Sequence, residues 1–285
     1  MGFLFRFDNF FYKDSYMSKI FFFDLDGTLL NSEKRITDRT MEALKAFTDA
    51  GNHFCINTGR AIDSAKAVYE GLGLDFKGSF LCGSNGTEIY SVDDKKYVYR
   101  TGIEIELVPK ILDLAEEYGV HCHTYNEDHI VSRHDGECMD YYRRVIKTPL
   151  IVTSDVLKVI HRPPSKMIAI ELHDHDKQER FREALQKMVG DKLTLLYSNP
   201  YYMEIFPSEA GKGSAVTRLA GILGIPVENT YAAGDEQNDI SMIEAAGCGI
   251  AMANATDMVK QIADVVTTYD NNHDGLAEFI LEAAK

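Results

Sequence analysis

Two carboxylates separated by one residue follow an apolar run near the start of the chain. Residues 24–28 read Asp-Leu-Asp-Gly-Thr and come directly after the β-rich run 19–23. A carboxylate that attacks phosphorus replaces one difficult displacement with two easier ones through a covalent intermediate. We therefore expect Asp24 to be the nucleophile of a phosphoryl transfer. Asp26 is expected to act first as acid and then as base, which requires that neighbouring carboxylates raise its pKa.

Groups that could hold the transferring phosphoryl oxygens stand at other points of the chain. Residues 58–60 read Thr-Gly-Arg after a second apolar run, and Lys212 lies at the start of an expected helix. Phosphoryl transfer needs hydrogen-bond donors and positive charge around these oxygens. Thr58 and Lys212 are predicted to supply them. The alternatives are a helix N-cap for Thr58 and a solvated surface lysine for Lys212.

The acidic residues also predict a metal site. Residues 234–239 read Gly-Asp-Glu-Gln-Asn-Asp. Asp24 and Asp235, together with water and a backbone carbonyl, would form an all-oxygen site that suits Mg²⁺ and not zinc. A cation would also offset the repulsion between a carboxylate and a phosphate dianion. We therefore expect an Mg²⁺-dependent reaction.

Regular alternation of strands and helices positions these residues. Apolar patterns predict strands at 19–23, 53–57 and 79–82 and helices at 37–50 and 61–70. The alternation returns with helices at 213–223, 238–246 and 256–262 and strands at 230–233 and 248–251. Such alternation is typical of an α/β fold with a parallel sheet, whose ligands gather at the carboxyl ends of the strands.

The middle of the chain has a different organisation. A hairpin is expected around residues 93–94, and residues 104–200 mix strands with helices at 106–118 and 176–188. We therefore predict a catalytic core formed by residues 18–88 and 205–285, with residues 89–204 as an inserted α+β cap. Residues 1–17 are treated as an N-terminal extension because Met17 stands just before the first strand.

Composition limits the class of protein. With 285 residues, of which 45% are hydrophobic and 26% charged, the chain should fold into about two domains. The net charge of -14 disfavours nucleic-acid binding, and no apolar run approaches the roughly 20 residues of a membrane span. Five cysteines without a CxxC pair favour a reducing cytoplasm. No pattern in the sequence indicates an oligomeric state.

The four motifs, in this order, resemble those of the haloacid dehalogenase superfamily of aspartate-nucleophile phosphatases, and within it the Cof-type hydrolases with a type IIB cap. The resemblance covers nearly all of residues 18–285. It implies a Rossmann-like core whose cap is inserted between the second and third motifs. It also implies that Asp26 gives its backbone carbonyl to Mg²⁺ and that Asp239 supports Lys212 and the metal. The positions that it assigns to substrate binding are Gly59, Arg60, Asn85 and Asn238.

The expected reaction is hydrolysis of a small phosphorylated metabolite. The resemblance favours sugar phosphates, followed by phosphorylated cofactors such as flavin mononucleotide or pyridoxal phosphate. Two alternatives use the same site: a phosphosugar mutase and a non-catalytic module that binds phosphorylated metabolites. A module that only binds needs no nucleophile, so the presence of Asp24 and Asp26 argues against it.

Several cap residues stay without a predicted role. His121 and His123 are expected to be a satisfied or exposed pair and not a metal site, because no further ligands accompany them. Tyr201 and Tyr202, with Glu204, could reach the active-site cleft or belong to a hinge.

Overall fold

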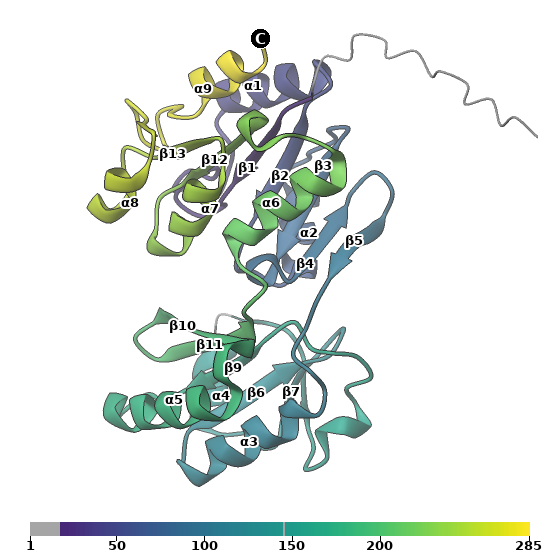
Figure 1. Ribbon diagram of the computed structural model, residues 1–285, viewed down its shortest axis with the longest axis vertical. Helices are drawn as coiled ribbons and strands as arrows, with labels where there is room; N and C mark the ends of the chain where they lie inside the picture. Colours follow the sequence, from purple (N-terminus) through teal and green to yellow (C-terminus); the bar gives the residue numbers. More distant parts are fainter. Residues whose placement is uncertain (1–17, 145) are drawn as a thin grey trace, which may run out of the picture.

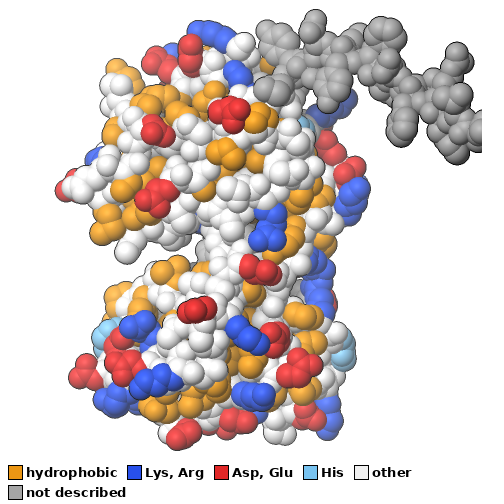
Figure 2. All heavy atoms as spheres, in the orientation of Figure 1, with side chains coloured by type: hydrophobic (Ala, Val, Ile, Leu, Met, Phe, Trp, Pro, Cys, Tyr) orange, Lys and Arg blue, Asp and Glu red, His pale blue; other side chains and the backbone are white. Residues whose placement is uncertain are grey.

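The computed structural model describes residues 18–144 and 146–285, which form two lobes connected by two passages of the chain (Figure 1). Each lobe is built on its own β-sheet. The space-filling view shows a notch on one side between the lobes (Figure 2). The predicted N-terminal extension 1–17 lies outside the described residues.

The larger lobe contains an eight-stranded sheet with the order β14-β13-β12-β1-β2-β3-β4-β5. The strands from β14 to β3 pair in parallel, and β4 and β5 add an antiparallel edge. The strands of this sheet are β1 (Ile20–Phe23), β2 (His53–Asn57), β3 (Ser79–Gly83), β4 (Glu88–Ser91), β5 (Lys96–Arg100), β12 (Thr230–Gly234), β13 (Cys248–Ala251) and β14 (Val265–Val266). This confirms the predicted α/β core with a parallel sheet.

Helices cover both faces of this sheet. They are α1 (Asp38–Asp49), α2 (Ile62–Gly71), α6 (Lys212–Leu223), α7 (Ile240–Ala245), α8 (Asp257–Ile262) and α9 (Ala277–Ala283). Phe21 and Phe23 of β1 belong to the apolar cluster that contains Phe47 of α1, whereas Phe22 packs in a second cluster with Leu219 of α6. Because side chains alternate along a strand, a strand covered on both sides is apolar at every position.

The smaller lobe contains a six-stranded sheet with the order β10-β11-β9-β6-β7-β8, antiparallel except for the β7–β8 pair. Its strands are β6 (His121–Tyr125), β7 (Ile130–Ser132), β8 (Leu150–Val152), β9 (Met167–Ile170), β10 (Leu193–Asn199) and β11 (Tyr202–Pro207). Its helices are α3 (Leu107–Glu117), α4 (Glu137–Tyr142) and α5 (His175–Val189). Residues of α3 and α5 pack with strand residues in one apolar cluster, and residues of α4 pack with strand residues in a second cluster.

The boundaries of the insert differ from the predicted 89–204. The expected hairpin exists as β4 and β5, but it extends the core sheet, and Ile89 packs in the same cluster as residues of α6. The chain therefore leaves the core after Arg100 and returns after Pro207, where β11 ends. The hairpin stays with the core because β4 pairs with β3.

Other elements follow the predicted pattern closely. Strands β2 and β13 have the predicted bounds, and α1 is one residue shorter at each end than expected. The helix predicted at 238–246 begins with a short 3-10 turn, Gln237–Asp239, before α7. None of the helices in the described residues has the length and apolarity that a membrane span needs.

Candidate active site

The carboxyl ends of β1, β2 and β12 meet at the edge of the core sheet. Ile20 to Phe23 of β1 pair in parallel register with residues of β12 on one side and β2 on the other. Asp24, Thr58 and Asp235 each follow the last residue of one of these strands. The predicted convergence of these three strand ends is therefore observed.

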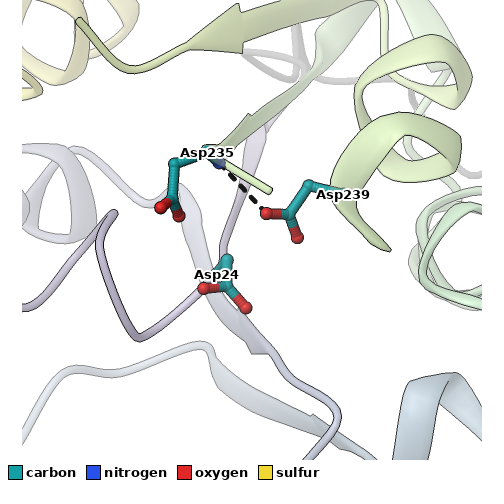
Figure 3. Close-up of side chains that lie close together, drawn as sticks. All are labelled: Asp24, Asp235 and Asp239. Carbon is teal, nitrogen blue, oxygen red and sulfur yellow. Dashed lines mark hydrogen bonds between the residues drawn. The ribbon is translucent and has the colours of Figure 1, made fainter. Parts of the chain in front are cut away.

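Three buried carboxylates form a compact cluster at this edge. Asp24, Asp235 and Asp239 each offer an oxygen atom within 4.8 Å of the others (Figure 3). Asp239 Oδ2 accepts hydrogen bonds from the backbone N–H groups of Asp235 (3.0 Å) and Glu236 (3.1 Å). The turn after β12 thus folds back so that Asp239 lies beside the residue that follows the strand.

Lys212 lies between two of these carboxylates. Its Nζ donates to Asp24 Oδ1 and to Asp239 Oδ1, each at 2.5 Å, and the residue is 2% exposed. The alternative of a solvated surface lysine is therefore wrong. Burial lowers the pKa of Lys212, but attraction by Asp24 and Asp239 is stronger and raises it above its usual value. The lysine is charged and fixed.

The cluster carries more negative than positive charge. Burial raises the pKa of Asp24 to about 6 although Lys212 opposes this shift. Burial also raises the pKa of Asp235 to about 7, with a hydrogen bond from Thr28 opposing and the charge of Asp24 adding to it. Three carboxylates face one ammonium group, so a divalent cation would balance the site.

The donor atoms fit a hard cation. All side chains of the cluster offer oxygen, which Mg²⁺ prefers. Asp235 Oδ2 accepts no hydrogen bond from the described residues, whereas both oxygens of Asp239 are already engaged. Asp24 and Asp235 are thus the side chains that could hold the ion. Asp239 holds Lys212 and the backbone of Asp235 in place.

Gly27 and Thr28 shape the approach of Asp235. Gly27 has a φ of +88°, and a Cβ at this position would lie 2.2 Å from Asp235 Oδ2, so a larger residue would collide with the carboxylate. Thr28 Oγ1 donates to Asp235 Oδ1 at 2.7 Å. The sequence assigned Thr28 no role of its own, although its place in the first motif could have indicated one.

Asp26 lies apart from the three-carboxylate cluster. Lys34 Nζ lies 2.7 Å from its Oδ1, and the guanidinium of Arg60 lies 2.6 Å from its Oδ2. Burial raises the pKa of Asp26, but these two cations outweigh it, and the pKa is lowered from its usual value. The expectation of a raised pKa is therefore wrong for this arrangement, because cations and not carboxylates surround the side chain.

The second motif forms a tight turn after β2. Thr58 Oγ1 accepts a hydrogen bond from the backbone N–H of Arg60 at 3.3 Å, and the N-cap of α2 is Ala61 and not Thr58. A Cβ on Gly59 would lie 3.0 Å from Asn85 Oδ1, so glycine allows the loops after β2 and β3 to approach closely.

The two asparagines expected to bind substrate lie in different surroundings. Asn85 is buried, and its Nδ2 donates to Glu204 Oε2 of β11 at 3.1 Å. Asn238 is exposed on the 3-10 turn after β12 and makes no side-chain hydrogen bond to the described residues. The structure therefore couples Asn85 to the smaller lobe, and substrate contact by either residue stays a prediction.

A cavity of about 1320 Å³ lies between the lobes. The larger lobe contributes Arg60 and Ser84 to its wall, and the smaller lobe contributes Lys166, Tyr202 and Glu204, among others. The cavity therefore begins beside Arg60, which contacts Asp26. Tyr202 and Glu204, which had no predicted role, thus line the cleft, whereas Tyr201 is exposed and does not line it. Ser84 and Lys166 were not singled out in the sequence.

The two histidines of β6 lie side by side, with His121 Nε2 3.3 Å from His123 Nδ1. Among residues 18–144 and 146–285, the one group of three or more potential metal ligands is the aspartate cluster, so the histidine pair gains no third ligand. All five cysteines are free, and Cys55 and Cys82 lie side by side on β2 and β3 with their Sγ atoms 3.5 Å apart.

Comparison with known proteins places this chain in a family. The model of haloacid dehalogenase-like hydrolases matches residues 21–280. A 5-amino-6-(5-phospho-D-ribitylamino)uracil phosphatase of Bacillus subtilis (strain 168) is 33% identical over 281 residues, covering 90% of this chain and 95% of the relative. A pyridoxal phosphate phosphatase of Escherichia coli (strain K12) is 28% identical over 273 residues, covering 92% and 97%.

Solved structures agree with this match. A haloacid dehalogenase-like hydrolase from Bacteroides thetaiotaomicron superposes with a TM-score of 0.81 and 30% identity, covering 93% of this chain and 99% of the other. The chain belongs to the haloacid dehalogenase-like hydrolase family. It is an enzyme of the phosphoric monoester hydrolase class that acts on small phosphate substrates.

Proposed function

We propose that this enzyme is an Mg²⁺-dependent phosphatase that forms an aspartyl-phosphate on Asp24. The observation that carries the proposal is the buried ammonium of Lys212, which holds Asp24 at 2.5 Å within a cluster of three carboxylates. The substrates would be sugar phosphates or phosphorylated cofactors, in line with the compounds named for the two phosphatase relatives. Residues 101–207 would act as the cap that selects among them.

Asp24 and Asp235 would hold the ion, with the backbone carbonyl of Asp26 as a further ligand. Bound Mg²⁺ would offset the charge of the phosphoryl oxygens as a carboxylate approaches them. Thr28 and Asp239 fix the position of Asp235 through the hydrogen bonds described above. The excess of carboxylates over ammonium groups supports this assignment.

In the first step a carboxylate oxygen of Asp24 forms a bond to phosphorus as the bond to the leaving oxygen breaks. The leaving oxygen takes a proton from Asp26. Lys212 orients Asp24, and Thr58 would donate a hydrogen bond to a phosphoryl oxygen. In the second step Asp26 removes a proton from water, whose oxygen attacks phosphorus. The bond from phosphorus to Asp24 then breaks and phosphate leaves.

Asp26 must therefore change protonation state during the cycle. Its contacts with Lys34 and Arg60 favour the carboxylate, which is the form that the second step needs. A bound phosphate dianion would add negative charge nearby and compete for Arg60. Both effects raise the pKa of Asp26 and favour the protonated form that the first step needs.

Two substitutions test the mechanism because they should fail differently. Asp24→Asn should abolish turnover and phosphoenzyme labelling for every ester. Asp26→Asn should slow hydrolysis of unactivated esters most. With para-nitrophenyl phosphate it should release a burst of about one equivalent per enzyme and then turn over slowly, because the second step lacks its base.

Stopped-flow absorbance would measure the burst, and intact-protein mass would detect the phosphorylated Asp24. Asp94→Asn is a matched control, because Asp94 is an exposed aspartate in the β4–β5 turn that pairs with Lys96. An Asp26→Asn enzyme without a burst that slows activated and unactivated esters equally would contradict the acid–base role.

A cytoplasmic location stays a prediction. The five thiols are unpaired, which is compatible with a reducing compartment.

A further inference from the structure

The cavity wall contains a buried ion pair that the proposed reaction does not use. Lys166 stands just before β9, and Glu204 lies on the neighbouring strand β11. Lys166 Nζ donates to Glu204 Oε2 at 3.0 Å, and the two residues are 7% and 8% exposed. Both line the cavity between the lobes.

This pair meets the larger lobe at the loops that follow β2 and β3. Lys166 Nζ also donates to the backbone carbonyl of Gly59 at 3.3 Å, and Asn85 Nδ2 donates to Glu204 Oε2 at 3.1 Å. Gly59 stands next to Arg60, which contacts Asp26. The pair therefore lies where the leaving group of a bound ester would begin.

Burial of an ion pair is poor evidence for a stabilising role. Removing two charges from water costs several kcal/mol per ion, and replacement by apolar residues is often neutral or stabilising. Attraction by Glu204 keeps Lys166 charged: burial lowers its pKa, but the net shift is upward. A charged pair at the wall of a cavity is accordingly suited to a polar ligand.

Unused hydrogen-bonding capacity points to that ligand. An ammonium group has three N–H donors, and Lys166 uses two of them on described residues. Glu204 Oε1 accepts no hydrogen bond from the described part of the chain, since both contacts are made by Oε2.

Ser84 supplies a third such group. It is 0% exposed, lines the same cavity, and its Oγ has no hydrogen-bond partner in the structure as described. Its backbone has a φ of 49°, unusual for serine, and its N–H donates to the carbonyl of Arg60 at 2.7 Å. A buried hydroxyl without a partner costs free energy, which a bound polar group would recover.

The free donor of Lys166, the free acceptor of Glu204 and the hydroxyl of Ser84 together suit a ligand with several hydroxyl groups. A hydroxyl group both donates and accepts, so one hydroxyl can donate to Glu204 and another can accept from Lys166. Ser84 Oγ can do either. A leaving group without hydroxyls would leave all three groups unsatisfied in a closed site.

We propose that Ser84, Lys166 and Glu204 are specificity-determining residues that bind hydroxyl groups of the leaving group close to the ester bond. The enzyme then prefers phosphate esters of sugars and polyols over esters of the same length without hydroxyls. This inference rests on the proposed function and assigns the substrate-selecting part of the same site.

The test separates binding from turnover. In an Asp24→Asn background with Mg²⁺, calorimetry compares ribitol 5-phosphate with n-pentyl phosphate, which has the same number of carbons and no free hydroxyl. Ribitol 5-phosphate should bind at least about 30-fold more tightly, because the site loses three hydrogen bonds with the alkyl ester. Adding Glu204→Gln or Ser84→Ala should reduce this ratio about 10-fold and about 3-fold, respectively.

Glu171→Gln is the matched control. Glu171 is another buried carboxylate of the smaller lobe that pairs with a lysine, Lys177, and it does not line the cavity. This variant should keep the ratio. Ser84→Ala removes no charge and keeps the inference testable if the Glu204 variant fails to fold.

Two outcomes would overturn the inference. One is a ratio of affinities near one in the parent. The other is a ratio that neither variant changes, whether or not both ligands bind more weakly, which would mean a purely structural role. Failure of the proposed function would look different. The enzyme with Asp24 intact would then release no phosphate from either ester, whatever the ratio of affinities.

Discussion

The two sides of the active-site cleft differ in how far their polar groups are already satisfied. On the core side, Lys212 is held by Asp24 and Asp239, and Asp239 is held in turn by two backbone N–H groups. On the cap side, Lys166 and Glu204 keep a donor and an acceptor that the described residues do not use. The aspartate–lysine cluster of the core is thus fixed before substrate arrives, whereas the Lys166–Glu204 pair of the cap, like Ser84 on the core wall of the cavity, keeps capacity that we propose the substrate uses.

From this contrast we predict that, among single substitutions outside Asp24 and Asp26, Lys212→Met has the largest effect on turnover. Loss of the ammonium removes the group that orients Asp24 and leaves two carboxylates to repel each other. We expect turnover of para-nitrophenyl phosphate to fall by about 10²- to 10³-fold or more, as for loss of a preorganised donor. Steady-state kinetics measures this effect, and thermal unfolding checks that the variant is folded.

Lys177→Met serves as the control, because Lys177 pairs with Glu171 in the cap and does not line the cavity. A Lys212→Met enzyme with normal turnover and only a higher KM would mean that Lys212 binds substrate without preparing Asp24.

An intermediate effect is expected for Thr28→Val. The substitution removes the hydrogen bond to Asp235 Oδ1 but keeps the shape of the side chain. Loss of such a supporting contact typically weakens metal binding by about 10- to 100-fold. Activity titrated with Mg²⁺ should show this shift, with activity recovered at high Mg²⁺.

Thr48→Val provides the comparison, since the Thr48 hydroxyl donates to backbone carbonyls within α1. An unchanged Mg²⁺ requirement in Thr28→Val would remove Asp235 from the metal site.

The smallest expected effect is that of pH on local stability. It has opposite signs in the two lobes of the metal-free protein. Burial, and then the charge of His134, lowers the pKa of His121 to about 4, and burial lowers that of His123 well below its usual value. The native cap therefore binds fewer protons than the unfolded chain between about pH 6.5 and 4. Acidification from about pH 7.5 to about pH 5 should destabilise the cap.

Asp24 and Asp235 give the stability of the core the opposite pH dependence, because their pKa values are raised to about 6 and about 7. Between about pH 7 and 4 the native core binds more protons than the unfolded chain, so the same acidification should stabilise it. Hydrogen exchange in β6 and β12, measured by mass spectrometry with a chelator present, would follow the two lobes separately.

The double variant His121→Asn/His123→Asn should flatten the pH dependence of the cap, while substitution of the exposed His161 by Asn should leave it unchanged. Equal pH dependence in both lobes would show that these groups do not set the local stability.

Prediction from sequence worked where the decisive residues directly follow apolar strands. The first and last motifs stand at such positions, so parallel pairing alone brings Asp24 and Asp235 together. The hairpin after β3 is harder to place, because its pattern identifies strands but not their partners. Its position in the core sheet depends on pairing with β3, which the local sequence does not specify.

Side-chain environments set by distant residues were also harder to predict. The lowered pKa of Asp26 results from Lys34, on a loop without a regular element, and from Arg60, 34 residues away. Likewise, the Lys166–Glu204 pair joins residues 38 positions apart through the register of a cap sheet. No local pattern in the sequence specifies either contact.

The two passages between the lobes place different constraints on the exchange of caps between related enzymes. On the return passage, Glu204 lies on the last cap strand and α6 begins at Lys212. This short stretch therefore carries a proposed substrate-selecting group at one end and a proposed catalytic group at the other. A chimaera would have to inherit residues 204–212 as one unit, because a cut inside them changes the spacing of the two groups.

The outgoing passage contains a natural junction. The backbone N–H of Thr101 donates to the carbonyl of Thr87 in the core, whereas that of Ile103 donates to the carbonyl of Pro164 in the cap. Gly102 between them is packed so closely against Pro163 that an added Cβ would lie 2.5 Å from its carbonyl oxygen. A graft that begins at this glycine, and keeps it, would leave the hydrogen bonds of both lobes intact.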